Sequence, residues 1–246
     1  MTQDLVARLR AAGCVFAEEE AALLLASPAF SEQLVHRRIS GEPLEYVLGW
    51  ADFIGVRYEI EPGVFIPRHR TEFLVRSAAE AAPASPVILD LCCGTGALGL
   101  AVQALVGGSL VATDIDPVAV RCARANGADA HLGDLFDSVP DALRGRVDVL
   151  LANTPYVPTS AIALLPPEFR EHEQRAALDG GADGLDLQRR VAAAASTWLD
   201  PGGTVYVEVA ESQARTSVDL FDAAGLAARV LADDDSTVVA ATRLTG

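Results

Sequence analysis

The stretch that decides the fold of this chain reads Val147-Asp148-Val149-Leu150-Leu151-Ala152-Asn153-Thr154-Pro155-Tyr156. Its first six residues are mostly apolar, which predicts a buried strand over 147–152. The Asn-Thr-Pro-Tyr that follows favours a loop at the C-terminal end of this strand, and open α/β sheets bind ligands at that edge. The loop offers a side-chain carbonyl, a backbone carbonyl beside a proline and an aromatic ring. Such acceptors suit an N–H group, although an ordinary strand exit can have the same sequence.

Apolar runs and helical patterns alternate on both sides of this stretch. The expected strands cover 87–92, 109–114, a short run ending near 133, 147–152 and 203–209. The expected helices cover 97–106, 117–126, 184–198 and 212–224, and the runs 226–231 and 237–242 are expected to pair as an antiparallel hairpin. Repeated strand–helix units predict an α/β fold with a parallel, doubly wound sheet.

The residues before the sheet divide into two parts. Helical periodicity predicts a small N-terminal helical domain at 1–40, and alternating apolar residues around a Glu-Pro-Gly turn predict a β-hairpin linker at 41–70. The main domain is expected to span 71–246. Its first helix, from Phe73 to about Ala82, is expected to pack on the edge of the sheet.

Composition and charge argue against several classes of protein. The 246 residues carry a formal net charge of −15, whereas nucleic-acid grooves are usually basic. No apolar run is long enough to cross a membrane, and the first residues do not resemble a secretory signal, so a cytoplasmic protein is expected. The 4 cysteines and 4 histidines are scattered without metal-ligand spacing, so no metal site is expected.

A glycine-rich turn, Asp90-Leu91-Cys92-Cys93-Gly94-Thr95-Gly96, follows the first strand of the sheet and lets a ligand approach the backbone closely. Two further acids end the next strands, where Asp114 suits ribose hydroxyls and Asp134 an adenine amino group packed on Leu135. The glycine spacing differs from the pyrophosphate fingerprint, and Asp90 would repel a diphosphate. S-adenosylmethionine, which is cationic and lacks phosphate, therefore fits this adenosine pocket better. A related fold whose acids only cap helices is the alternative.

The order of the motifs resembles one enzyme family. The turn at 90–96 resembles the first motif of class I methyltransferases. The segments that resemble the HemK/PrmC family of protein-(glutamine-N5) methyltransferases are Gly41–Gly49, Pro62–Arg68, Gly133–Phe136, Asn153–Tyr156 and Ala177–Leu185. This resemblance covers nearly the whole chain after about Gly41. It implies a Rossmann-like sheet, S-adenosylmethionine as cofactor, and a glutamine of a release factor or ribosomal protein as methyl acceptor.

The resemblance also implies which residues form the site. The implied cofactor-binding residues are Asp90, Cys92, Cys93, Gly94, Thr95, Gly96, Asp114, Ile115, Asp134, Leu135 and Asn153. The implied catalytic residues are Asn153, Thr154, Pro155 and Tyr156. Our hypothesis is that the Asn153 side-chain oxygen and the Thr154 backbone carbonyl accept the two amide N–H groups, while Pro155 stiffens the loop and Tyr156 packs on the substrate.

The chain departs from the family pattern at several positions. Thr154 replaces the first proline of Asn-Pro-Pro-Tyr, His69 and Arg70 stand within the Pro-Arg-Pro-Glu-Thr-Glu motif, and Cys92 replaces a glycine. Because the same acceptors hold any planar amino group, methylation of a nucleic-acid base or of a small molecule is an alternative. A cofactor-binding protein without activity is another. Glu208 is expected either to be buried near the pocket or to be a solvated or capped carboxylate, and 179–181 is interpreted as a turn feeding the next helix.

Overall fold

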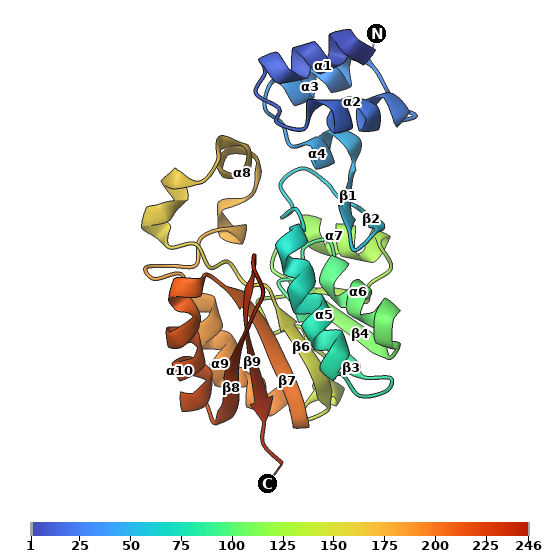
Figure 1. Cartoon of the computed structure of the whole chain (residues 1–246). Coiled ribbons are helices and arrows are strands. Elements are labelled where there is room, and N and C mark those ends of the chain that lie inside the picture. The colour runs from blue at the N-terminus through green and yellow to red at the C-terminus, as the bar shows by residue number, and fades with distance from the viewer. Residues whose placement is uncertain (1, 246) are drawn as a thin grey trace.

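The computed structural model describes residues 2–245, and a seven-stranded sheet lies at its centre (Figure 1). The strands, in their order across the sheet, are β5 (Ala130–Leu132), β4 (Ser109–Asp114), β3 (Val87–Leu91), β6 (Val147–Ala152), β7 (Leu199–Val209), β9 (Thr237–Arg243) and β8 (Leu226–Ala232). The first five run parallel, and β9 pairs antiparallel with β7 and β8. The predicted Rossmann-like α/β fold is confirmed. The strand order reverses at β3, and open α/β sheets bind ligands beside such a switch point.

Helices cover both faces of the sheet. One face carries α5 (Glu72–Ala81), α6 (Ala97–Val106) and α7 (Pro117–Ala125), and the other carries α9 (Asp186–Trp198) and α10 (Ala214–Ala223). Successive residues of a strand point to opposite faces, so Ile88 joins the α5 layer and Leu89 joins the α9 layer. The predicted strand 147–152 is therefore buried from both sides.

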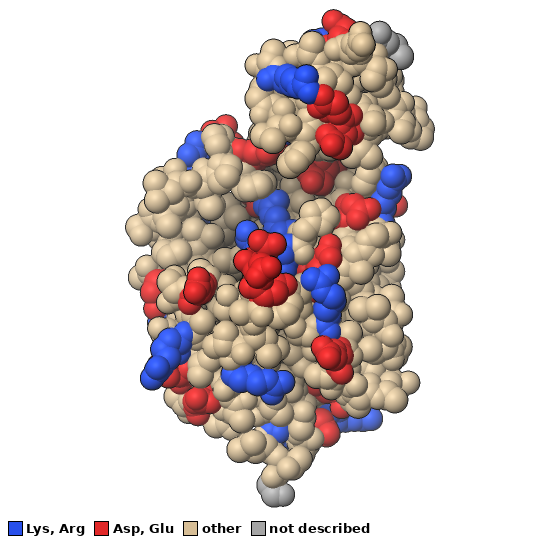
Figure 2. All heavy atoms as spheres, in the orientation of Figure 1, with Lys and Arg blue, Asp and Glu red and all other residues tan. Residues whose placement is uncertain are grey.

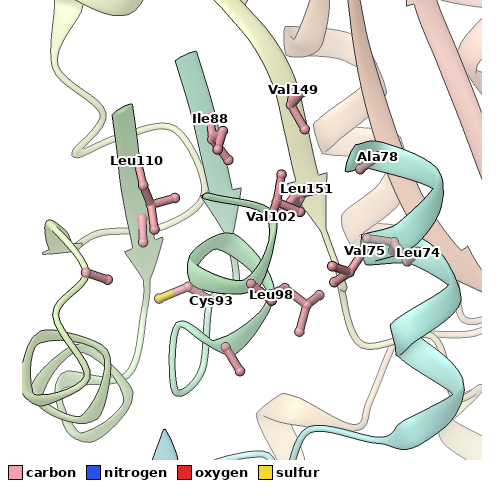
Figure 3. Packing of buried hydrophobic residues seen from close by; sticks show 14 of the residues in the cluster. Leu74, Val75, Ala78, Ile88, Cys93, Leu98, Val102, Leu110, Val149 and Leu151 are labelled. Atoms are coloured by element: carbon pink, nitrogen blue, oxygen red, sulfur yellow. The ribbon is translucent and has the colours of Figure 1, made fainter. Parts of the chain in front are cut away.

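Helix α5 lies over the face of the sheet, not on its edge as the sequence predicted. Its buried residues Leu74, Val75 and Ala78 share one core cluster with Val102 of α6 and Leu151 of β6 (Figure 3). An amphipathic helix buries more apolar surface over central strands than beside an edge strand, which explains the difference. The short η1 (His69–Thr71) immediately before α5 is thereby held close to the C-terminal ends of the strands.

A separate helical unit precedes the sheet and stands above it in Figure 1. It consists of α1 (Thr2–Ala11), α2 (Ala17–Ala26), α3 (Glu32–Ile39) and the short α4 (Leu44–Leu48), which the sequence did not predict. The unit has its own apolar core around Leu9 and Leu24, and Arg38 makes a buried ion pair with Glu20 at 2.6 Å. The hairpin of β1 (Trp50–Phe53) and β2 (Val56–Glu59) joins it to the sheet, and its turn lies at Ile54–Gly55, not at the predicted Glu-Pro-Gly turn. The domain boundaries at 40 and 70 stay a prediction.

The long segment between β6 and α9 contains short helices: η3 (Thr159–Leu164), α8 (Pro167–His172) and η4 (Arg175–Ala177). Two further short helices are η2 (Asp141–Leu143) before β6 and η5 (Glu211–Gln213) before α10. We call residues 158–184 the excursion, and it passes over the C-terminal edge of the sheet, where it lines the main cavity. Among residues 2–245, no helix combines the length and the apolar character that a membrane span requires.

Candidate active site

One cavity of about 1210 Å³ opens at the C-terminal ends of β3, β4 and β6. It exceeds the volume of a typical site for one small ligand, so it has room for a cofactor together with part of a second molecule. All but one of the residues predicted for the site line it: Asp90, Cys92, Cys93, Gly94, Thr95, Asp114, Ile115, Asp134, Leu135, Asn153, Thr154, Pro155 and Tyr156. The fold thus brings the glycine-rich turn, two strand-end acids and the Asn153–Tyr156 loop to one place.

Gly96 is the exception, because it does not line the cavity. Gly96 is the N-cap residue of α6 and has a φ of +77°. A Cβ at this position would lie 3.2 Å from the Cβ of Ala123 and 3.3 Å from that of Ala128. Glycine therefore allows α6 to start close against α7, which gives Gly96 a packing role, and its contact with the cofactor stays a prediction. Cys92 also has a left-handed backbone, with φ of +55°, a conformation that side chains other than glycine seldom adopt.

Asp90 lies at the floor of the cavity and is 1% exposed. Its Oδ2 accepts a hydrogen bond from the backbone N–H of Gly99 at 3.0 Å. Burial, with a smaller contribution from the negative charge of Asp114, raises the pKa of Asp90 to about 7. A cation bound in the cavity would favour the ionised carboxylate, which fits a sulfonium or ammonium group better than a phosphate.

Asp114 is oriented by two backbone N–H groups. Gly94 donates to its Oδ2 and Asp116 to its Oδ1, both at 2.9 Å. Each carboxylate oxygen keeps a free acceptor position, so the pair suits the two hydroxyls of a ribose. Asp134 differs, because its Oδ2 accepts from Arg190 at 2.9 Å, which leaves Oδ1 for an adenine amino group. This set of acids fits the predicted nucleoside of S-adenosylmethionine.

The Asn153–Tyr156 loop follows β6 and lines the same cavity. No hydrogen bond within residues 2–245 engages the Asn153 side chain or the Thr154 carbonyl, so both acceptors are free for a ligand. Thr154 is 1% exposed, and its hydroxyl has no partner among the described residues. A proline at this position would present the same backbone carbonyl, so the replacement by Thr154 leaves the acceptor in place.

The excursion supports this loop more closely than the sequence predicted. Gly180 donates its N–H to the carbonyl of Val157 at 2.9 Å, and a Cβ on Gly180 would lie 2.6 Å from the carbonyl oxygen of Pro155. A Cβ on Gly184 would overlap the carbonyl oxygen of Tyr156. Residues 179–184 therefore support the backbone of the loop, a role that the sequence did not predict for them beyond the turn that feeds α9.

The excursion also covers the acceptor side of the cavity. Arg68 stacks on Phe65 and Phe169, 4.9 and 3.9 Å from the ring centroids, and makes an ion pair with the buried Glu173. The Gln174 side chain donates a hydrogen bond to Asp116 Oδ2 at 2.8 Å and so connects the excursion to the loop that follows β4. These residues come from segments far apart in the sequence, and the family-like motif at 62–68 gave a signal for Phe65 and Arg68 only.

Tyr156 is held at both ends. Gln213 donates to its backbone carbonyl at 2.9 Å, and Arg70 donates to its hydroxyl at 2.7 Å. The hydroxyl donates in turn to Glu208 at 2.7 Å. Glu208 is 2% exposed, so the expectation of a solvated carboxylate is wrong and the expectation of a position near the pocket is confirmed. No group of three or more metal-ligating side chains is formed within residues 2–245.

Known proteins resemble this chain over most of its length. The family described as ribosomal protein L11 methyltransferase matches residues 69–172. A release factor glutamine methyltransferase of Geobacter sulfurreducens is 39% identical over 212 residues, which cover 83% of this chain and 74% of that protein. A 4-amino-L-phenylalanine/4-methylamino-L-phenylalanine methyltransferase of Streptomyces pristinaespiralis is 34% identical and covers 78% of this chain and 69% of its own length. The solved E. cuniculi Mtq2–Trm112 complex, which methylates the termination factor eRF1, shares the fold with a TM-score of 0.55 at 20% identity, covering 74% of this chain and 99% of that one.

Proposed function

This chain belongs to the release factor glutamine methyltransferase family, and we propose that it methylates the side-chain amide nitrogen of a glutamine in a peptide-chain release factor. As a member of that family it is an enzyme that uses S-adenosylmethionine. The observation that carries the proposal is the pair of free acceptors, the Asn153 side chain and the Thr154 carbonyl, in the same cavity as the nucleoside-binding acids.

The cofactor is proposed to lie on the strand-end acids. Asp114 would hold the ribose hydroxyls, Asp134 the adenine amino group, and Asp90 would face the positive charge of the methionine part. Cys93, Gly94 and Thr95 would contact the cofactor through the turn that carries them, and Ile115 and Leu135 would enclose the adenine. When bound, S-adenosylmethionine supplies an electrophilic methyl group.

The loop is proposed to orient the acceptor. An amide nitrogen is a weak nucleophile because its lone pair is delocalised, so the line of attack has to be fixed. The Asn153 oxygen and the Thr154 carbonyl would accept the two N–H bonds of the glutamine amide. Positive charge develops on this nitrogen as the new bond forms, and two fixed carbonyl dipoles stabilise it. Pro155 would keep the loop stiff, and the ring of Tyr156 would pack on the glutamine side chain.

The proposed protein partner is a release factor, whose modified glutamine lies in a Gly-Gly-Gln loop. A net charge of −15 favours approach to a basic partner. On the face shown in Figure 2, acidic and basic side chains alternate in small groups without an extended basic surface. This face therefore offers no basic groove for a nucleic acid, and the net charge of −15 favours a protein substrate over a nucleic acid. A cytoplasmic location is part of the same proposal, because release factors act on ribosomes.

A second candidate is N-methylation of a small aromatic amine. The observation that favours it is the 34% identity to the 4-amino-L-phenylalanine methyltransferase. A planar aryl amine offers two N–H groups to the same acceptors, so the loop alone does not distinguish it from a glutamine amide.

Mass spectrometry of the methylated product tests both candidates. The enzyme is incubated with S-adenosylmethionine and, separately, with a release factor, a ribosomal protein, tRNA, DNA and 4-amino-L-phenylalanine. We expect one added methyl group on the glutamine of the Gly-Gly-Gln loop. Methylation of the amino acid with no change in the release factor would decide for the second candidate, and a methylated base would overturn both.

A further inference from the structure

Three polar side chains from distant parts of the chain meet at the hydroxyl of Tyr156. Arg70, in η1, donates from Nη2 to the Tyr156 oxygen at 2.7 Å and from Nε to Glu208 Oε1 at 3.1 Å. The Tyr156 hydroxyl donates to the same Glu208 oxygen at 2.7 Å. Each of the three groups therefore contacts the other two, and we call this set the tyrosine lock.

The members of the lock differ in their access to the cavity. Arg70 and Tyr156 line the cavity, whereas Glu208, which β7 supplies, is not among the described residues that line it. Glu208 is 2% exposed, and burial together with the charge of Glu208 raises the pKa of Tyr156. Tyr156 thus stays a protonated donor. Glu208 therefore influences a substrate indirectly, through its hydrogen bond with Tyr156.

The lock fixes a part of Tyr156 that the main chain leaves free. Gln213 donates to the backbone carbonyls of Tyr156 and Asp183, both at 2.9 Å, and so fixes the position of the loop. The direction of the ring is a separate matter, because a side chain can change rotamer on a fixed backbone. Among residues 2–245, the Tyr156 hydroxyl accepts a hydrogen bond from Arg70 and donates one to Glu208.

We propose that Arg70 and Glu208 are positioning residues that hold the Tyr156 ring in the direction the methyl acceptor needs, an inference that rests on the proposed role of the Asn153–Tyr156 loop. The planar guanidinium serves both partners at once, which a lysine ammonium on a single flexible stem does less well. Charge-assisted hydrogen bonds are the stronger kind, so a lock of this type keeps the ring in place while the acceptor enters.

A direct contact between Arg70 and the substrate is the rival explanation. Its side chain is 49% exposed, it lines the cavity, and its guanidinium keeps N–H donors beyond the two that the lock uses. The two explanations differ in one respect. If Arg70 acts through the tyrosine hydroxyl, removing that hydroxyl also removes the effect of Arg70; if Arg70 binds the substrate, the two effects add.

A double-mutant cycle with Arg70→Gln and Tyr156→Phe makes this distinction. The acceptor is a recombinant release-factor domain with its Gly-Gly-Gln loop. We expect Arg70→Gln and Glu208→Gln each to raise the KM for this acceptor by about tenfold with little change in kcat, because the ring packs on ground state and transition state alike. In the Tyr156→Phe background, Arg70→Gln should change KM by less than about twofold. Arg70→Lys should restore only part of the affinity.

A second measurement needs no methyl acceptor. The chain has 4 tyrosines, so ¹³Cζ-tyrosine labelling gives four NMR signals, and the Tyr156→Phe variant assigns the relevant one. We expect this signal to move in Arg70→Gln and in Glu208→Gln. Tyr46, whose hydroxyl donates to the Val64 carbonyl at 2.6 Å, is an internal reference that should stay unchanged.

The matched control is Arg76→Gln on α5, whose side chain pairs with Glu72 at 3.0 Å outside the main cavity. It should leave both the KM and the Tyr156 signal unchanged. Additive effects of the two substitutions in the double-mutant cycle would contradict the proposal. A Tyr156 NMR signal that stays unchanged in both Arg70→Gln and Glu208→Gln would contradict it as well. If the wild-type enzyme methylates no glutamine at all, the proposed function fails, and the NMR signals still decide whether Arg70 and Glu208 hold Tyr156.

Discussion

The cofactor side and the acceptor side of the cavity differ in how far apart their residues lie in the sequence. The cofactor side comes mainly from 90–135, where Asp90 and Asp114 stand at the ends of their own strands and are oriented by nearby backbone N–H groups, and Asp134 pairs with Arg190. The acceptor side combines Arg70, the Asn153–Tyr156 loop, the glycines at 180 and 184, Glu208 and Gln213. Local rules of strand and turn therefore describe the first side, whereas the second depends on how distant segments pack.

The largest expected effect lies on the acceptor side. Asn153→Ala removes one of two carbonyl acceptors, and by analogy with other preorganised hydrogen-bonding groups kcat should fall by about 100- to 1,000-fold. Calorimetric titration with S-adenosylmethionine should give nearly unchanged affinity, because the strand-end acids remain. Turnover of Asn153→Ala at the wild-type rate would show that Asn153 has no role in methyl transfer. The acceptor side would then not depend on the Asn153–Tyr156 loop in the way proposed.

Gly184→Ala tests how strictly the excursion supports the loop. The new Cβ would overlap the carbonyl of Tyr156, so we expect a loss of about 2–4 kcal/mol in unfolding free energy, measured by denaturant unfolding. Gly202→Ala is the control, because Gly202 also has a positive φ, +93°, but nothing lies within 4 Å of its added Cβ. An equal loss in both variants would mean that backbone strain alone matters.

Asp114→Asn tests the cofactor side. An amide has one acceptor oxygen where the carboxylate has two, and its NH2 would face a backbone donor. The affinity for S-adenosylmethionine should fall by about 10- to 100-fold by calorimetry. The exposed Asp141→Asn should show no change, and retained affinity in Asp114→Asn would contradict the predicted ribose contact.

The pH dependence of cofactor binding follows from Asp90. Its pKa is raised to about 7 by burial, against about 3.9 in an unfolded chain, so between these values the folded protein binds more protons. Stability of the cofactor-free protein should therefore fall as pH rises from about 4 to 7 and then level off. A bound cation favours the ionised form, so affinity for S-adenosylmethionine should rise about tenfold between pH 6 and 8. An affinity in Asp90→Asn that still rises tenfold would exclude Asp90 as the cause.

The smallest expected effect concerns Thr154. Its buried hydroxyl has no partner among the described residues, so Thr154→Val should raise the unfolding free energy by about 1 kcal/mol and Tm by about 2–4 °C in thermal unfolding. Methyl transfer should persist because the backbone carbonyl remains. Thr113→Val is the opposite case, because the Thr113 hydroxyl donates to the Leu135 carbonyl at 2.7 Å, and this variant should be destabilised. Destabilisation of both would show that the Thr154 hydroxyl is satisfied by water or by a ligand.

Much of the fold could be predicted because the signals are local. Strand β4 (Ser109–Asp114), strand β6 (Val147–Ala152) and helix α6 (Ala97–Val106) have the predicted bounds, since a run of apolar residues with clear breakers defines each one. The position of α5 was predicted wrongly, because periodicity shows that a helix has a buried face but not which surface covers it.

The sequence by itself determined the sheet, the strand-end acids and the loop that carries Asn153, because strand period, turn residues and the ends of parallel strands are properties of short segments. Only the tertiary structure decided that Gly96 packs α6 against α7, that Gly180 and Gly184 support the loop, and that Arg70 and Glu208 meet on Tyr156. These contacts join residues up to 138 positions apart. No local pattern encodes such a pairing, because it depends on which surfaces the packed helices and strands leave facing one another.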